Sequence, residues 1–381
     1  MAQQRRSLGD EAWVRLLGGD PRSLLLKSGE PAARWVTLTK LLGRPEGDPE
    51  VLQAHEEVLA DAGTRSLIDR IPDWEVDTKL SGHNAPGFAP NLLNLLADMG
   101  LRAGDDPAVE RLLDQMLEHQ DADGRFASYG TSRATPEPIW GALLCDAHAV
   151  TEVLVRFGRW DDPRTSAALE RMEIDLARTD QGRAWPCVPG SGTGFRGPGR
   201  KTDFCPQVTL EALRTFARLP ARRRPRGLLD VARTSLRAWR VRGEEKPYVF
   251  GHGVQFKTVK WPTSWYDVHM VLDTLSRFPG LWRGPRSRPE DRRALAELAA
   301  CMVAYNVGPD GRVTPRSCYR GFEGFSFGQK KVPSAFATAR LAAVLRRLDD
   351  LAPEIRAVDV RKLTSSKGGS GTAVPPKVRP A

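Results

Sequence analysis

Residues 204–216 read FCPQVTLEALRTF, and variants of this stretch recur along the chain. Each copy is mostly apolar and carries a leucine that is followed three residues later by another large apolar residue. The other copies are GFAPNLLNLLADM (87–99), CDAHAVTEVLVRF (145–157), YDVHMVLDTLSRF (266–278) and FATARLAAVLRRL (336–348). Because the copies follow one another at intervals of about sixty residues, the chain is a repeat protein.

A second set of helical patterns alternates with these copies, and its members carry a charged face. They span residues 106–120, 162–179, 227–242 and 289–307. Asp-Pro and Pro-Glu pairs among their first residues are helix-opening signals. Helices that are apolar around most of their circumference are buried, and amphipathic ones are exposed on one side. The alternation therefore predicts an all-α fold, an α/α toroid with inner and outer helix rings. The inner helices are predicted to start near residues 140, 204, 265 and 334.

Three domain segments follow from this pattern. Residues 1–75 are predicted to be an N-terminal helical segment that completes or caps the ring, and residues 76–350 to form the toroid. Residues 364–381 are rich in Gly, Ser and Pro and lack apolar residues for a core, so they are predicted to be a disordered tail.

Composition narrows the functional classes. The 381 residues carry a net charge of +10. The sequence contains no run of 18 apolar residues, so no transmembrane helix is expected. The first residues lack the apolar core of a signal peptide, and the five cysteines form no CxxC pair. We therefore expect a cytoplasmic protein with free thiols. The sequence contains no zinc-finger spacing and no basic region with heptads, which argues against nucleic acid as a partner.

The turn between two helix sets carries a family resemblance. Residues 120–126 read QDADGRF, and this QxxDGxF turn together with the repeat period resembles the terpenoid cyclase and protein prenyltransferase β-subunit superfamily over roughly residues 80–350. FRGPGRK (195–201), WYD (265–267) and FGQK (327–330) also resemble a bacterial group of squalene-cyclase-like repeat proteins of uncharacterised reaction. The resemblance implies an α/α toroid that acts on isoprenoid substrates.

One segment resembles the prenyltransferase zinc site. GFRGPGRKTDFC, residues 194–205, is similar to the family's GFxGRxxKxxDxC segment but is one residue shorter between Lys201 and Asp203. The resemblance implies zinc held by Asp203 and Cys205 and a substrate diphosphate held near Arg200 and Lys201. His269 is the third ligand that the family pattern implies. The alternative is that Asp203 caps a helix and that Cys205 is a buried structural thiol.

The repeat alignment gives the candidate catalytic residues. Equivalent positions on the five apolar helices are occupied by Phe88, Asp146, Cys205, Asp267 and Ala337. We predict Asp146, Cys205 and Asp267 as catalytic, at one level of the ring and facing its cavity. This register makes Asp267 an alternative to His269 as the third zinc ligand. In the competing interpretation each acid caps its own helix or pairs with a loop arginine.

Basic and aromatic residues cluster in the loops that precede the apolar helices. A basic rim above an apolar cavity suits a substrate with an anionic head and a hydrophobic tail, although these lysines also fit a solvated surface. The predicted substrate-binding residues are Arg200, Lys201, Lys257, Lys260, Trp265, Tyr266 and Lys330.

Two functions therefore remain open. The first is an isoprenoid transferase or cyclase; the DxDD acid of alkene-protonating cyclases is missing from the sequence, so catalysis itself stays open. The second is a non-catalytic toroid that binds a lipid-like ligand or a protein partner. A glycoside-active α/α barrel using Asp146 and Asp267 fits less well, because the inner helices are apolar and the rim is basic.

Overall fold

The computed structural model describes residues 11–76, 80, 82–131, 137–187, 202–245 and 251–363. The chain divides into two compact units. The first unit comprises Met1–Val58, His252–Pro262 and Asp267–Ala381, and the second comprises Leu59–Gly251 and Thr263–Tyr266. The described residues are mostly helical and their strands form only two-stranded pairs, which confirms the predicted all-α class.

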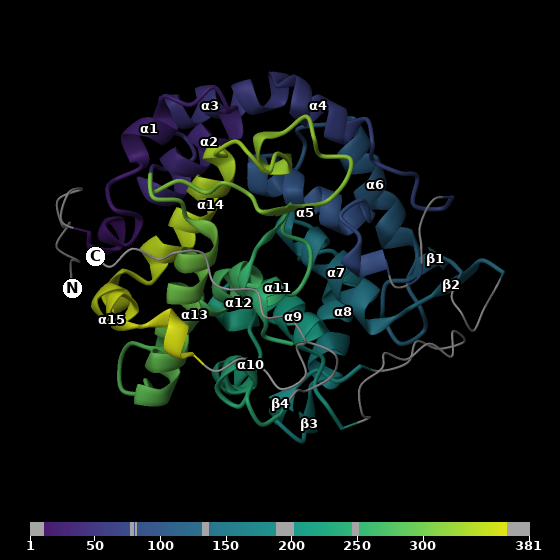
Figure 1. The fold of residues 1–381 in the computed structure, drawn as a ribbon. Coiled ribbons are helices and arrows are strands. Elements are labelled where there is room, and N and C mark those ends of the chain that lie inside the picture. Colours follow the sequence, from purple (N-terminus) through teal and green to yellow (C-terminus); the bar gives the residue numbers. More distant parts are fainter. Residues whose placement is uncertain are drawn as a thin grey trace. The chain divides into compact units, whose positions relative to one another are not determined.

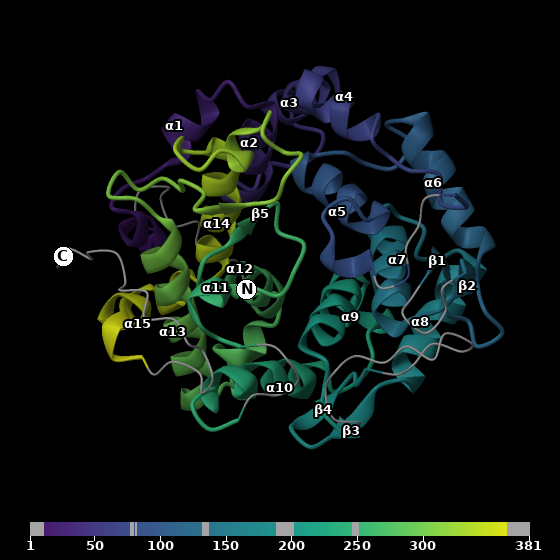
Figure 2. The same ribbon diagram turned by 45° about the vertical axis from the view of Figure 1, so that its right-hand side comes forward.

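The second unit contains three of the repeated apolar helices. They are α5 (Ala89–Met99), α7 (Leu144–Arg156) and α9 (Pro206–Arg218), and α7 contacts both of the others (Figure 2). The remaining helices of this unit are α4 (Ala62–Ile68), α6 (Pro107–Glu118), α8 (Pro163–Ile174) and α10 (Leu228–Arg240). Residues 144–155 of α7 are all buried, as its apolar pattern predicted.

Two antiparallel hairpins follow the turns of the second unit. β1 (Ser128–Gly130) pairs with β2 (Ile139–Gly141), and β3 (Ala177–Thr179) pairs with β4 (Gly182–Ala184). The second hairpin packs on α10. These short pairs lie in the connections that join one helix to the next.

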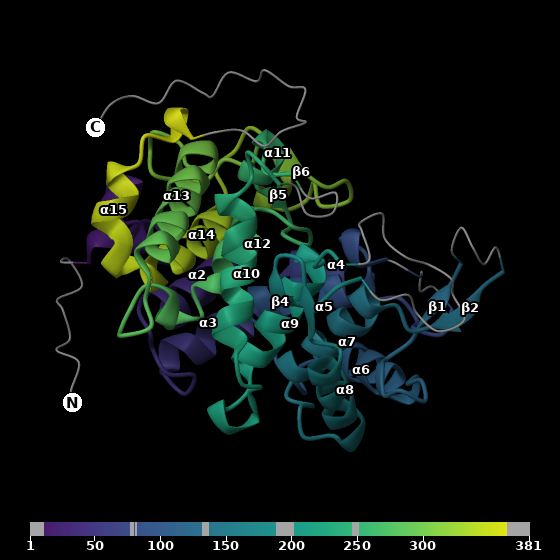
Figure 3. The same ribbon diagram turned by 90° about the horizontal axis from the view of Figure 1, so that it is seen from below.

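The first unit joins the N-terminal helices to the last helices of the chain. In Figure 1, α2 (Pro31–Val36) lies beside α14 (Ala335–Arg347), and the two are in contact. Figure 3 shows α15 (Ala352–Ala357) alongside α13 (Pro289–Asn306). The other elements are α1 (Arg22–Leu26), α11 (Val254–Lys257), α12 (Val268–Leu275) and the parallel pair β5 (Lys260–Trp261) and β6 (Ser317–Cys318). Helix α3 (Pro49–Ala60) runs across the boundary of the two units.

The helix starts agree with the sequence signals. Asp106 and Asp162 are the N-caps of α6 and α8, and their side chains accept hydrogen bonds from the backbone N–H groups of Ala108 and Arg164, both at 2.8 Å. The proline that follows each aspartate needs no hydrogen-bond acceptor at the first helical position. The four predicted buried helices begin at residues 144, 206, 268 and 335, within a few residues of expectation.

The QxxDGxF turn explains how one helix pair is joined to the next. Gln120 donates from Nε2 to the carbonyls of Gly124 (2.7 Å) and Arg164 (2.8 Å), so the turn is bonded to α8. Gly124 has φ +86°, a conformation that side chains disfavour. Asp121 accepts from the backbone N–H of Arg125 at 2.8 Å. Asp121 therefore stabilises the turn itself.

Candidate functional site

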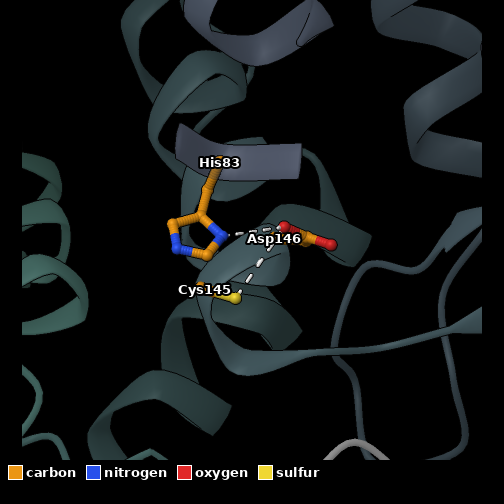
Figure 4. Close-up of side chains that lie close together, drawn as sticks. All are labelled: His83, Cys145 and Asp146. Atoms are coloured by element: carbon orange, nitrogen blue, oxygen red, sulfur yellow. Dashed lines mark hydrogen bonds and ion pairs between the residues drawn. The ribbon is translucent and has the colours of Figure 1, made fainter. Parts of the chain in front are cut away.

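Asp146 lies at the centre of a buried polar cluster in the second unit. Its carboxylate is fully buried in the first turn of α7. His83 Nδ1 lies 3.5 Å from Asp146 Oδ1, and Cys145 Sγ lies 3.8 Å from the same oxygen (Figure 4). Among the described residues, these are the His, Cys, Asp and Glu side chains that come together as a possible metal-binding group, with ligand atoms within 4.8 Å of one another. We call them the His83–Cys145–Asp146 cluster.

Asp146 reaches across to another segment because α7 begins before it. The N-cap of α7 is Leu143, so Asp146 is the third residue of the helix. At the equivalent repeat position Asp267 is itself the N-cap of α12 and accepts from the backbone N–H of Met270 at 2.8 Å. The capping interpretation thus describes Asp267, whereas the Asp146 carboxylate points to the segment that carries His83.

The loop before α5 holds His83 in place. His83 lies in a single 3₁₀ turn, Gly82–Asn84. Asn91, on α5, donates from Nδ2 to the carbonyls of His83 and Ala85, each at 2.8 Å. The His83 ring also packs against the ring of Trp265, with centroids 5.1 Å apart. These contacts fix the imidazole toward Asp146 rather than leaving it in the loop.

Gly82 has no room for a side chain, which gives a first prediction. A Cβ built on Gly82 would lie 2.6 Å from Phe88 Cδ2, whereas a Cβ on Gly87 would meet no heavy atom within 4 Å. Overpacking of this kind costs typically about 1–3 kcal/mol. We expect Gly82→Ala to lower the free energy of unfolding in urea by that amount and Gly87→Ala to change it by less than about 0.5 kcal/mol. Equal effects of the two variants would contradict this packing.

Glu211 adds a second buried acid near the cluster. It lies on α9 and is only 2% exposed. Gln207 Nε2 donates to its Oε1 at 2.7 Å, and Oε2 has no hydrogen-bond partner among the described residues. Burial raises the pKa of Glu211 to about 7, against the opposing effect of the His83 charge. Glu211 is therefore poised to change charge near neutral pH.

The same electrostatics act on His83 and Cys145. Burial alone would lower the pKa of His83, but contact with Asp146 and the charge of Glu211 raise it above its ordinary value. Burial, with Asp146 and Glu211 nearby, raises the pKa of the Cys145 thiol well above its usual range. The cluster thus favours a protonated imidazole, and its thiol ionises only if a cation is supplied.

The residues of the zinc site that the family resemblance implies belong to different units: Asp203 and Cys205 lie in the second unit, and His269 lies in the first. Cys205 is the N-cap of α9 and is buried, and burial raises the pKa of its thiol strongly. Asp203 accepts at 3.0 Å from Nε2 of Gln181, in the turn before β4. His269 belongs to the first unit, where its ring lies 5.7 Å from that of Trp261. The combination of Asp203 and Cys205 with either His269 or Asp267 stays a prediction.

The predicted substrate-binding residues are distributed over both units. Arg200 and Lys201 lie outside the described residues. Trp265 is half-buried and Tyr266 is buried, both in the second unit. The remaining three belong to the first unit, where Lys257 is buried and Lys260 and Lys330 are exposed.

Lys260 and Lys330 both lie around the β5–β6 pair of the first unit. Lys260 Nζ lies 3.8 Å from the centroid of the Tyr319 ring, and Tyr319 directly follows β6. The charge of Lys330 acts on the Cys318 thiol of β6. Two of the predicted rim lysines therefore border one small strand pair. Lys257, in contrast, lies inside the unit with Nζ 5.5 Å from the Tyr305 ring centroid.

Sequence reasoning did not single out His83 or Cys145. The first and weakest repeat copy carries Phe88 at the position of Asp146, Cys205 and Asp267, so the repeat alignment gives no sign of a polar site there. A histidine shortly before the apolar helix at 89–99 is the signal that would have found it, and Cys145 is the direct neighbour of Asp146.

Comparison with known proteins gives no family. No protein-family model and no curated protein matches the chain. One solved structure, the crystal structure of "a protein from Actinoplanes", aligns over 90% of this chain and 100% of its own with 14% identity and a TM-score of 0.39. Similarity at this level supports no inference about function. In the described part of the chain, none of the helices has the length and apolarity needed to cross a membrane.

Proposed function

We propose that the chain is a prenyltransferase- or terpenoid-cyclase-like protein that acts on a hydrophobic, isoprenoid diphosphate-type substrate. The observation that supports this most directly is an ionisable pair, His83 with Asp146, at the start of helix α7. Residues 144–155 of this helix are buried. This combination suits isoprenoid chemistry, because the substrate chain is a hydrocarbon and its reaction generates charge.

The surroundings of the cluster fit an apolar substrate. Helix α5 contributes mainly leucine and alanine to the interior of the second unit. The Trp265 ring lies against His83, and an aromatic face beside a cationic group or intermediate stabilises it through its quadrupole. The apolar helices would bind the hydrocarbon chain, and Asp146, His83 and Trp265 would stabilise the charge that develops during the reaction.

Within the first unit, two lysines beside the β5–β6 pair support an anionic head group on the ligand. Lys260 and Lys330 are exposed there, and lysine is a common phosphate-binding residue because it acts as a point charge. In this proposal the repeated helix pairs close into an α/α toroid, as their alternation predicts, and the substrate occupies its cavity.

Ligand-induced stabilisation tests the function. We expect farnesyl or geranylgeranyl diphosphate at about 100 times its Kd to raise the stability of the full chain by about 2.7 kcal/mol. Inorganic pyrophosphate and the matching alcohol should each give a smaller shift, because each supplies half of the ligand. Thermal melts with the three compounds make the comparison, and Lys260→Ala with Lys330→Ala should reduce the diphosphate-dependent part.

Pyrophosphate release then separates the two open functions. An isoprenoid transferase given a thiol or alcohol acceptor, or a cyclase, should release pyrophosphate, because the C–O bond to the diphosphate breaks as the prenyl carbon bonds to the acceptor or to an alkene of the same chain. Asp146→Asn should abolish that release. Stabilisation without any release, with and without added Mg²⁺ or Zn²⁺, would identify a non-catalytic binder of lipid-like ligands. No stabilisation by any of the three compounds would contradict the proposal.

A further inference from the structure

We propose that His83, Cys145 and Asp146 form a binding site for one thiophilic divalent metal ion, with zinc as the best-fitting ion. The site lies wholly within the second unit. It differs in position and ligands from the Asp203, Cys205 and His269 set that the family resemblance implies. It goes beyond the proposed function, because metal binding is measured without any substrate.

The spacing of the three side chains matches the coordination sphere of zinc. Zinc bonds of about 2.0–2.1 Å to nitrogen, 2.0–2.2 Å to oxygen and 2.3 Å to sulfur, at tetrahedral angles, separate nitrogen from oxygen by about 3.4 Å and sulfur from oxygen by about 3.6 Å. The corresponding separations are 3.5 Å from His83 Nδ1 to Asp146 Oδ1 and 3.8 Å from Cys145 Sγ to the same oxygen. Small side-chain rotations would bring all three atoms onto one ion.

The buried polar atoms around the cluster are an independent observation. His83 Nδ1 is buried, and its contact with Asp146 Oδ1, at 3.5 Å, is at the limit of a hydrogen bond. Glu211 Oε2 is buried without a hydrogen-bond partner in the same part of the structure. Buried polar atoms normally have partners, so such exceptions mark places where an ion or water belongs. A divalent cation would satisfy the imidazole and offset the nearby carboxylates.

Several cysteines lie close together at this site, and a sulfur ligand favours some metal ions over others. Cys187 and Cys205 both lie near enough to Cys145 to act electrostatically on its thiol. Hard cations such as Mg²⁺ and Ca²⁺ prefer sites built only from oxygen, whereas a mixed imidazole, thiolate and carboxylate set suits zinc. Because metal binding requires the thiolate and a neutral imidazole, the ion would displace the Cys145 proton and the His83 Nδ1 proton to bulk solvent.

The position of the ligands gives the ion a definite role. Cys145 and Asp146 belong to the first turn of α7, and His83 belongs to the turn before α5. Three protein ligands leave the fourth tetrahedral position open, as in catalytic rather than structural zinc sites. The ion would therefore both fasten the His83 turn to α7 and present a coordination position for water or a ligand beside Trp265.

Cobalt substitution and direct metal counting test the site. The full chain is stripped with chelator and titrated with Co²⁺ alone, and a parallel sample is loaded with Zn²⁺ and weighed by native mass spectrometry. We expect one ion per chain, with a sulfur-to-cobalt charge-transfer band and the visible bands of tetrahedral cobalt. Cys145→Ser should remove the charge-transfer band, and His83→Gln should weaken binding more than about 100-fold, beyond the 10–100-fold typical of losing a supporting residue.

Two controls separate this site from the alternatives. Cys301→Ser changes a buried cysteine of the first unit and should leave binding unchanged. Cys205→Ser distinguishes the two candidate sets. The proposal is overturned if the parent protein binds no ion in the absence of chelator, or if binding survives His83→Gln and Cys145→Ser but is lost in Cys205→Ser or His269→Ala. His83→Gln changes a residue in the turn before α5, outside the buried helices. This variant therefore tests metal binding even if Cys145→Ser does not fold.

Discussion

Replacing Asp273 with asparagine is expected to lower the free energy of unfolding by about 1–3 kcal/mol, between the cost of losing an exposed ion pair and that of breaking a fully buried one. Asp273 lies on α12 of the first unit and accepts from Arg347 Nη2 at 2.5 Å and from Arg277 Nη2 at 3.1 Å. Burial lowers the pKa of Arg347 to about 10. Without the carboxylate, these half-buried guanidiniums would lose the anion that lies opposite them.

The pH dependence of this loss has a definite sign. Burial alone would raise the pKa of Asp273, but Arg277, Arg347 and Arg340 hold it well below its usual value. A depressed carboxyl pKa contributes stability above the unfolded pKa and loses it as pH falls through the folded pKa. The difference between wild type and Asp273→Asn should therefore stay constant from pH 8 to about pH 5 and shrink below about pH 4.

Urea denaturation at several pH values measures both effects. Asp230→Asn is the matched control, because Asp230 pairs with Arg233 at 3.0 Å but its side chain is 64% exposed. Exposed pairs contribute about 0–1 kcal/mol. A loss below about 1 kcal/mol in Asp273→Asn would show that water or Arg347 rearrangement compensates for the missing charge.

The helices were predictable from the sequence because their signals are local. Apolar periodicity and the Asp-Pro starts depend on neighbouring residues, and Asp106 and Asp162 cap the helices that they were predicted to begin. Leucines at the end of each repeat copy fixed the alignment, and the observed helix starts follow it to within three residues. Closure of the helix pairs into a ring depends on contacts between distant parts of the chain and stays a prediction.

The site was harder to predict because equivalent repeat positions have different partners. Asp146 and Asp267 align, yet Asp267 caps α12 while Asp146 contacts His83. The difference arises because α7 begins two residues before Asp146, whereas α12 begins one residue after Asp267. Sequence periodicity does not predict helix boundaries this accurately. The sequence therefore identified Asp146 as buried and ionisable but could not identify the loop histidine opposite it.

Glu211→Gln is expected to stabilise the protein at pH 8 by up to about 3 kcal/mol, which corresponds to a carboxyl pKa raised from 4.5 to about 7. The folded state holds a proton on Glu211 that the unfolded state releases between these pH values. Wild-type stability should then be highest below about pH 4.5, fall as pH rises and level off above about pH 7. Glutamine resembles the protonated acid, so the variant should lack this slope.

Glu152→Gln is the matched comparison, since Glu152 occupies the equivalent repeat position on α7. Its carboxylate accepts from Arg214 Nη2 at 2.6 Å and lies 3.7 Å from Arg218, so the glutamine variant loses a buried ion pair and should be less stable at pH 8. Denaturation of chelator-treated wild type and both variants from pH 5 to 8 measures the opposite signs. A flat wild-type profile, or a Glu211→Gln protein less stable than wild type at pH 8, would mean that Glu211 is held as a paired carboxylate. Because Zn²⁺ binding displaces protons from its ligands, adding Zn²⁺ should stabilise both the wild type and Glu211→Gln more at pH 8 than at pH 5.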